Sequence, residues 1–187
     1  MAGNMKAVKL RIKSVQSTMQ ITKAMELVAS SKLRKAKERA ETCRPYFTEL
    51  HETLKDIARE NIDFSSVYAR ESSNPRYCYV AIAGDRGLAG GYNANLFKCL
   101  EAAAEGKDYV ALPIGKKAVE YFRQRGIECL TDKFAEIADI SVADCFEIAN
   151  LLCEEFRKGT FGHIELCYTV FASMLFSACR RYFLYFL

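Results

Sequence analysis

A glycine-rich stretch, GDRGLAGGYN at residues 84–93, is the part of this 187-residue sequence whose residue types could hold a phosphate group. It follows an apolar run that predicts a strand and precedes a run that predicts a helix, which is where glycine-rich loops cradle phosphates. It has neither the G-x-G-x-x-G spacing of dinucleotide-binding loops nor the Lys-Ser or Lys-Thr ending of a P-loop. We therefore favour a tight projecting turn over a nucleotide site, with Asp85 and Asn93 hydrogen-bonded to the backbone and Asn93 capping the next helix.

Other side chains with catalytic or metal-binding chemistry are scattered along the sequence. His51 and His163 lie in different predicted elements, and the acidic pairs at 101/105 and 154/155 fit solvated helix faces. Eight cysteines occur, but no two are separated by only two residues, which argues against a zinc ribbon or a redox pair. Since no signal peptide is recognisable, we expect reduced thiols. The sequence therefore predicts no catalytic residue, no metal site and no cofactor.

Positive charge is concentrated near the N-terminus. Residues 1–40 hold ten Lys or Arg and two Glu, a net charge of +8, which leaves −4 for the other residues. A basic arm of this kind predicts an acidic partner, whether nucleic acid, an anionic membrane surface or an acidic protein surface. No aromatic residue lies within residues 1–40 to stack on bases, so nucleic acid is the less favoured partner. No run approaches the roughly 20 uncharged apolar residues that a membrane-spanning helix needs.

An unbroken helix is predicted for residues 4–44, which contain neither Gly nor Pro. Forty helical residues reach roughly 60 Å, more than the width of a small domain. Eleven positions in this helix follow an uninterrupted alternation of three- and four-residue steps, and nine of them are apolar: Met5, Val8, Ile12, Val15, Met19, Thr22, Glu26, Ala29, Leu33, Ala36 and Ala40. Such a seam is typical of a coiled coil and requires a partner helix.

Two features modify the predicted seam. At Thr22 and Glu26 the seam positions are polar. Around them the apolar face is widened by a second apolar track, formed by Ile21, Met25 and Val28. Pro45 predicts a kink or a restart of the helix, with a further helical stretch over 46–61. The alternative is an amphipathic helix that lies on its own domain, but a helix of this length would extend beyond the domain.

From residue 75 onward, apolar runs of strand length alternate with runs of helix length. The predicted strands cover 76–84, 108–115, 127–132 and 163–171. The predicted helices cover 94–106, 116–126 and 141–159, and Ser141 and Asp144 suit the N-terminus of the last one. The alternation predicts an α/β fold with a Rossmann-like, mostly parallel sheet and crossover helices. We therefore expect three parts: a helical arm over 1–60, an α/β domain over 75–175 and an atypical apolar tail over 176–187.

Two strings of the sequence resemble a known family. RIKSVQSTMQITKAMELVASSKLRKAKERAE resembles the N-terminal helix of the gamma subunit of F-type ATP synthases, and DRGLAGGYNANLFK resembles a loop of its α/β domain. The resemblance covers roughly residues 5–175. It implies a central rotor stalk that couples proton-driven rotation to ATP synthesis or hydrolysis in the catalytic beta subunits and has no chemistry of its own. It also implies an antiparallel coiled coil inside the hexamer of alpha and beta subunits, with the α/β domain near the epsilon subunit and the c-ring.

The resemblance assigns a set of residues to contacts with the alpha and beta subunits: Lys23, Met25, Lys32, Leu33, Arg34, Lys35, Asp85, Arg86, Gly87 and Leu88. The four cations of the helix, which are Lys23, Lys32, Arg34 and Lys35, would meet acidic lever loops of beta. The last four residues of the set would form a projecting loop that also faces beta. Family members continue through a final strand and a C-terminal helix, whereas this sequence ends at Leu187, so we expect an incomplete copy without its coiled-coil partner helix.

The expected location is the cytoplasmic face of a bacterial inner membrane, as a peripheral protein without a membrane span of its own. The alternative functions are a basic helix that binds nucleic acid or an anionic surface, and a nucleotide-binding α/β enzyme.

Overall fold

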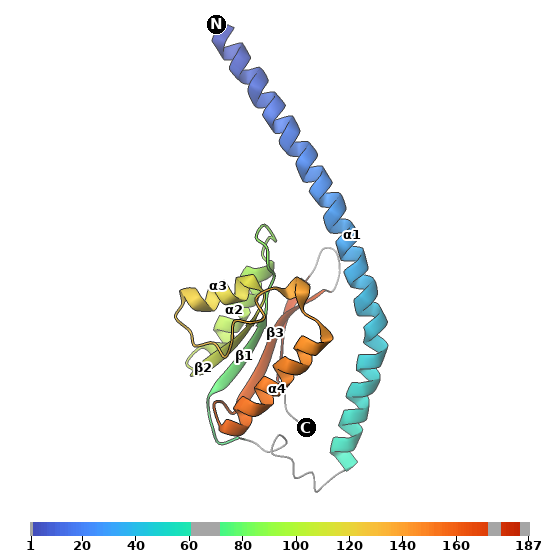
Figure 1. Ribbon diagram of the computed structural model, residues 1–187, viewed down its shortest axis with the longest axis vertical. Coiled ribbons are helices and arrows are strands. Elements are labelled where there is room, and N and C mark those ends of the chain that lie inside the picture. The colour runs from blue at the N-terminus through green and yellow to red at the C-terminus, as the bar shows by residue number, and fades with distance from the viewer. Residues whose placement is uncertain (1, 61–71, 172–176, 184–187) are drawn as a thin grey trace. The chain divides into compact units, whose positions relative to one another are not determined.

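The computed structural model describes residues 2–60, 72–171 and 177–183 (Figure 1). Contacts divide the chain into two units, Met1–Ile62 and Asp63–Leu187. The first unit contains one helix and the second contains an α/β sheet domain, and each unit is described by itself.

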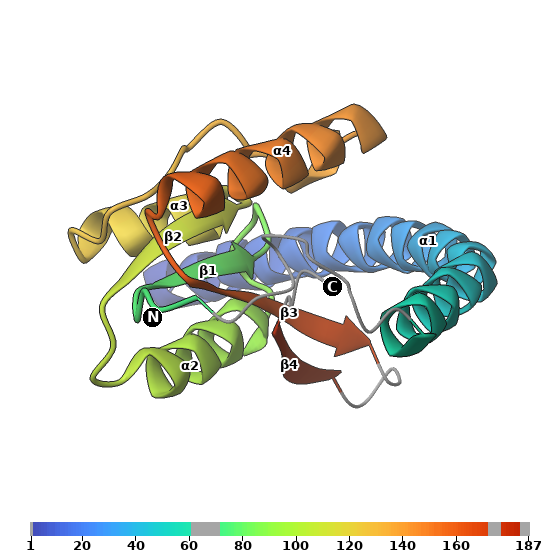
Figure 2. The ribbon, with the colours of Figure 1, turned by 90° about the horizontal axis from the view of Figure 1, so that it is seen from below.

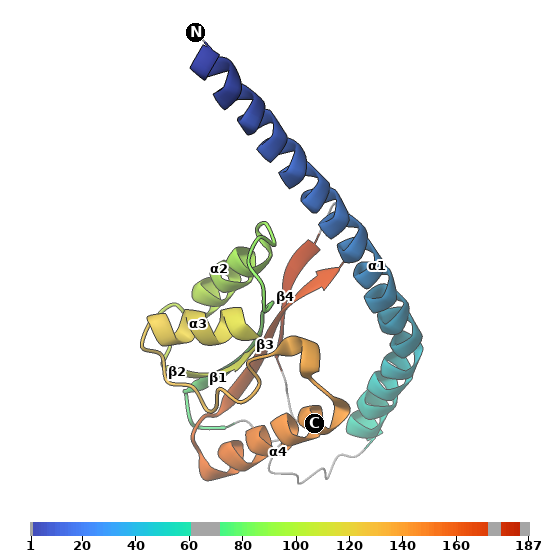
Figure 3. The ribbon, with the colours of Figure 1, turned by 45° about the horizontal axis from the view of Figure 1, so that its top comes forward.

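Helix α1 spans Ala2–Glu60 without a break. At 1.5 Å per residue its 59 residues reach roughly 90 Å. Pro45 lies inside the helix, so the helix does not restart there, and Figure 3 shows α1 curving over its second half. Proline removes one backbone donor, but a helix whose neighbouring carbonyls remain open to water tolerates that loss with a bend.

The second unit is built on a four-stranded sheet. Its strands are β1 (Tyr77–Ile82), β2 (Tyr109–Ile114), β3 (His163–Phe171) and β4 (Ser177–Phe183), in the order β2-β1-β3-β4. Strand β1 pairs in parallel with both β2 and β3, whereas β4 pairs antiparallel with β3. The predicted mostly parallel sheet is confirmed.

Two local predictions for the sheet are wrong. The strand predicted over 127–132 makes only an isolated bridge between Ala111 and Cys129, after which the chain turns away from β2. Part of the predicted tail over 176–187 forms β4, which lies beside β3 at an edge of the sheet (Figure 2). Residues 184–187 lie outside the described residues.

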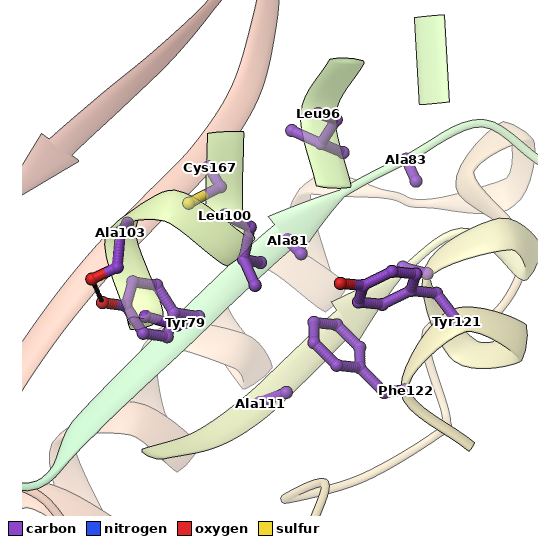
Figure 4. Packing of buried hydrophobic residues seen from close by; sticks show 12 residues of the cluster. Tyr79, Ala81, Ala83, Leu96, Leu100, Ala103, Ala111, Tyr121, Phe122 and Cys167 are labelled. Atoms are coloured by element: carbon purple, nitrogen blue, oxygen red, sulfur yellow. Dashed lines mark hydrogen bonds between the residues drawn. The ribbon is translucent and has the colours of Figure 1, made fainter. Parts of the chain in front are cut away.

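Helices cover both faces of the sheet. Helices α2 (Tyr92–Ala104) and α3 (Lys116–Gln124) contribute to one buried apolar cluster, and α4 (Val142–Lys158) contributes to the other. Figure 2 shows α2 and α4 on opposite sides of the sheet. Successive strand residues point to opposite faces, so Tyr79 belongs to the first cluster and Val80 to the second. The buried hydroxyl of Tyr79 donates a hydrogen bond to the carbonyl of Ala103 at 2.9 Å, which ties α2 to β1 (Figure 4).

The predicted N-terminus of α4 is confirmed in detail. The Ser141 hydroxyl accepts a hydrogen bond from the backbone of Asp144 at 3.2 Å, and the Asp144 carboxylate accepts one from the backbone N–H of Ser141 at 2.8 Å. This reciprocal capping box satisfies two backbone donors that a helix N-terminus otherwise leaves unpaired. The helix ends at Lys158, and the following C-cap residue, Gly159, has a φ of 78° that suits glycine.

Candidate functional site

The apolar seam of α1 is exposed along its length. The large seam side chains are between 40% and 65% exposed: Met5, Val8, Ile12, Val15, Met19 and Leu33. The smaller seam residues Ala29 and Ala36 are exposed as well. A helix that completes its packing within its own unit buries its apolar stripe, so the exposed seam is a candidate surface for a partner.

The structure extends the seam beyond the predicted residues. Because α1 continues through Pro45, the alternation of three- and four-residue steps runs on from Ala40 without a slip, through Cys43, Phe47, Leu50, Leu54 and Ile57. The large side chains of this extension are exposed too; Leu50, for example, is 44% exposed. The sequence carried this signal, but with a kink or a restart left open at Pro45 the two apolar faces were not joined into one seam.

The second apolar track gives α1 apolar surface outside the seam. Ile21, Met25 and Val28 are each 57–60% exposed, and nearby Leu27 is 68% exposed. Ile21 and Met25 lie on one flank of the seam and Leu27 lies on the other, by helical geometry. One partner helix packed on the seam therefore leaves part of the apolar surface of this segment uncovered.

Cations border the seam of α1. In each four-residue step of the seam, the first and third intervening residues flank the contact with a partner helix. Seven of these fourteen positions between Val8 and Leu54 are Lys or Arg and none is acidic: Lys9, Arg11, Lys23, Lys32, Lys37, Arg39 and Arg44. The flanks therefore favour a partner helix with acidic residues beside its own seam.

The four predicted contact cations fall into two pairs on α1, and all four are exposed. Lys23 and Lys32 flank the seam, whereas Arg34 and Lys35 lie on the outer face of the helix. The guanidinium of Arg34 lies 3.8 Å from the Glu38 carboxylate, one turn along. Arg34 and Lys35 are thus available to a surface other than the coiled-coil partner.

The glycine-rich loop projects from the sheet domain between β1 and α2 (Figure 1). Arg86, Gly87 and Leu88 are exposed at its tip, and Leu88 is fully exposed. Leu88 also has a φ of 59°, in the left-handed region that few residues other than glycine adopt. An apolar side chain held outward in this conformation is a candidate contact with a partner.

Asp85 lies at the base of this loop rather than at its exposed tip. Its carboxylate accepts three backbone hydrogen bonds, from Lys116 at 3.1 Å, Ile137 at 3.0 Å and Ala138 at 3.3 Å. Burial acts to raise the pKa of Asp85, but these donors and the Lys116 charge outweigh it and hold the pKa below its usual value. The structure thus separates Asp85 from the other predicted loop contacts.

Asn93 closes the other side of the loop. Its Oδ1 accepts a hydrogen bond from the Gly84 N–H at 2.9 Å, which confirms the predicted bond to the backbone. The prediction that Asn93 caps α2 is wrong, because the cap position is Gly91, without a side-chain cap. The amide is engaged with Gly84 and its residue lies already within the helix.

The remaining candidates for chemistry have structural surroundings. His51 stacks on Phe47 within α1, with ring centroids 5.8 Å apart, and His163 stacks on Tyr77 in the sheet at 4.7 Å. All eight cysteines are free thiols. Among the residues that the structure describes, no group of three or more His, Cys, Asp or Glu side chains is placed to hold a metal ion. None of the described helices is long and apolar enough to cross a membrane.

Comparison with known proteins relates nearly all of the described chain to one family. A family model described as ATP synthase matches residues 4–183, past the limit of residue 175 predicted from the sequence. The ATP synthase gamma chain of Ruminococcus albus is 49% identical over 179 residues, which cover 92% of this chain and 62% of the relative. The sodium ion specific gamma chain of Acetobacterium woodii is 36% identical over 176 residues, which cover 94% and 58%. This chain therefore spans about three fifths of the length of these curated relatives.

A solved structure supports the same fold. The central stalk and c-ring structure of the Tetrahymena thermophila mitochondrial ATP synthase matches with a TM-score of 0.64 and 20% identity, covering 88% of this chain and 72% of the other. At this identity the match shows a shared fold: a long N-terminal helix followed by a mostly parallel sheet domain. Since the family model matches all but seven terminal residues, the chain belongs to the ATP synthase gamma-chain family.

Proposed function

We propose that this chain serves as the central rotor stalk, or gamma subunit, of an F-type ATP synthase. In this role it couples ion-driven rotation to ATP synthesis or hydrolysis at the beta subunits and performs no chemistry itself. The observation that carries the proposal is the seam of α1, which continues from Met5 to Ile57 and is exposed throughout the described large side chains. A rotor needs a stiff rod, and a two-stranded coil resists bending better than a single helix.

The surfaces of α1 suit a shaft that turns within a collar of alpha and beta subunits. The seam takes a partner helix, and the second apolar track with Met25 leaves surface for the collar. Arg34 and Lys35 are solvated cations, and such charges attract acidic loops through weak, screened forces without fixing one orientation. This combination permits attraction to the collar during rotation.

The sheet domain supplies the second set of proposed contacts. The tip of the glycine-rich loop, Arg86–Leu88, faces a beta subunit, and the remaining surface of the domain lies toward the epsilon subunit and the c-ring. The assembly lies at the cytoplasmic face of a bacterial inner membrane, in keeping with the bacterial relatives.

The seam is tested with a matched pair of lysine substitutions. Ile12 lies in the seam and Leu10 lies opposite it, and the two residues are 52% and 63% exposed. The probe is the part of the Ruminococcus albus gamma chain that this chain does not match, and its affinity for the full chain is measured by calorimetry. Ile12→Lys is expected to weaken binding tenfold or more, because burying an Ile side chain is worth about 1.5–3 kcal/mol. Leu10→Lys is expected to bind like the unmodified chain.

Assembly is tested with the same variants. The full chain and this probe are mixed with alpha and beta subunits, and we expect co-elution of the four components, lost with Ile12→Lys and retained with Leu10→Lys. Equal behaviour of the two variants refutes the seam as the partner surface. Absence of assembly, together with tight duplex-DNA binding that falls steeply with salt, refutes the rotor function in favour of a nucleic-acid binder.

A further inference from the structure

The glycine-rich loop is fixed by its base. The three N–H groups bound by Asp85 come from two other segments of the domain, the start of α3 at Lys116 and the 3-10 helix η2 (Ile137–Asp139). One carboxylate thus joins the end of β1 to elements 31 and 52 residues further along the chain. Hydrogen bonds to a carboxylate are stronger than bonds between neutral groups.

The backbone around Asp85 is closely packed. A Cβ on Gly115 would lie 2.2 Å from the carbonyl oxygen of Ala83 and 3.5 Å from Asp85 Oδ1. Glycine therefore allows the chain before α3 to approach the end of β1, and this approach brings the Lys116 N–H to the carboxylate. The base of the loop is built from closely fitted backbone.

The tip of the same loop has open surroundings. A Cβ on Gly87 or Gly90 would meet no atom within 4 Å, and Arg86 and Leu88 are exposed. The left-handed φ of Leu88 is therefore not imposed by packing around the tip. The conformation of the tip is therefore set by the two ends of the loop. One end is held by the Asp85 carboxylate and the other by the Asn93–Gly84 hydrogen bond.

We propose that Asp85 is a positioning residue for partner binding: its carboxylate contacts no partner but holds the loop so that Leu88 is presented in an ordered conformation. This inference rests on the proposed contact between the loop tip and a beta subunit. Ordering the tip before association removes an entropic penalty from binding. Loss of the Asp85 carboxylate therefore weakens binding through Leu88.

A double-substitution cycle tests this role in the full chain with the Ruminococcus albus probe. The affinity for the alpha–beta assembly is measured for Asp85→Asn, Leu88→Ala and the double variant, with Asp132→Asn as control. Asp132 is an exposed carboxylate 3.5 Å from Arg123, outside the loop. Each single loop variant is expected to weaken binding about tenfold, a typical effect of losing an interface anchor or its preorganisation. The double variant is expected to bind no worse than Leu88→Ala, and Asp132→Asn is expected to have no effect.

Each other outcome overturns a specific step. If the losses of affinity add up in the double variant, Asp85 acts independently of Leu88. If Leu88→Ala weakens binding but Asp85→Asn does not, the positioning role of Asp85 is refuted. An inert Leu88→Ala removes the loop contact itself, whereas the Ile12→Lys test of the seam still decides the rotor function.

A measurement without the partner keeps the proposal testable. A nitroxide label is placed at Leu88→Cys in a Cys43→Ser, Cys145→Ser background, because both of those thiols are exposed. We expect Asp85→Asn to speed the motion of the label in the electron paramagnetic resonance spectrum while near-ultraviolet circular dichroism stays native. An unchanged spectrum overturns the positioning role.

Discussion

Gly115→Ala is the substitution for which the structure makes the sharpest prediction. Gly115 has φ 94° and ψ 148°, a region that is essentially restricted to glycine, and non-glycine residues there pay about 1–3 kcal/mol. Its added Cβ would also lie 2.2 Å from Ala83 O, whereas real Cβ contacts do not fall below 3.0 Å. The two backbone segments must therefore move apart, and such overpacking costs about 1–3 kcal/mol. Together these effects predict a loss of roughly 4 kcal/mol in the free energy of unfolding.

Two other glycines separate the two contributions. Gly126 has a φ of 64°, but a Cβ there would meet no atom within 4 Å, so Gly126→Ala carries strain alone, about 1 kcal/mol. Gly162 has no left-handed φ, but its Cβ would lie 2.1 Å from Asn74 O, so Gly162→Ala carries overlap alone, about 1–3 kcal/mol. The expected order of destabilisation is Gly115→Ala, then Gly162→Ala, then Gly126→Ala.

Urea unfolding of the full chain, followed by near-ultraviolet circular dichroism, measures these differences. The chain has ten Tyr and no Trp, and α1 contains one of the tyrosines, Tyr46, so the signal reports mainly on the sheet domain. If Gly115→Ala destabilises the domain no more than Gly126→Ala, then Ala83 and Gly115 do not approach closely and the account of the loop base fails.

Three further predictions concern single side chains of the chain. Ser141→Ala removes the N-cap of α4 and is expected to destabilise the domain by about 1 kcal/mol in the same urea assay. Burial and the hydrogen bond to Glu101 raise the pKa of Tyr121, so the unfolded chain releases this proton near pH 10 while the folded chain retains it. The free energy of unfolding is therefore expected to fall as the pH rises above about 10, and to fall less steeply in Tyr121→Phe. An equal dependence on pH in the two proteins would contradict a buried Tyr121 phenol. Cys43 is exposed and is expected to react at once with a thiol reagent, whereas Cys78, whose pKa burial raises, reacts only on unfolding.

The parts of the fold that follow from the sequence are those with local signals. Strand β1 is apolar on both faces, since Tyr79 and Val80 enter different clusters, and such a continuous run indicates a parallel strand between helices. The cap at Ser141 and the turn at the glycine-rich loop depend on residues close together in the chain. The cap and the turn could be predicted because their partners lie close by in the chain, and β1 could be predicted from its own apolar run.

The features that could not be predicted depend on distant partners. Strand β4 is held by its pairing with β3, in which Arg180 lies opposite Tyr168. No local sequence pattern predicts that pairing. The role of Asp85 depends on N–H groups 31 to 53 residues away. At Pro45 the sequence left a kink and a restart open, and only the restart is excluded: proline removes one hydrogen bond, and a long helix continues despite that loss.

The repeat of the α1 seam has a consequence for the cross-section of the proposed shaft. A strict seven-residue repeat drifts about 20° per repeat around a straight helix, so a partner that follows it winds in a left-handed supercoil. Between Met5 and Ile57 the axial distance is roughly 78 Å, about half of a typical supercoil pitch of roughly 150 Å. A partner helix that follows this seam would therefore begin on one side of α1 and end on the opposite side. The wider dimension of the cross-section of such a helix pair would then point in a different direction at each height. Subunits arranged around the proposed shaft would therefore contact different sides of the pair at the same time.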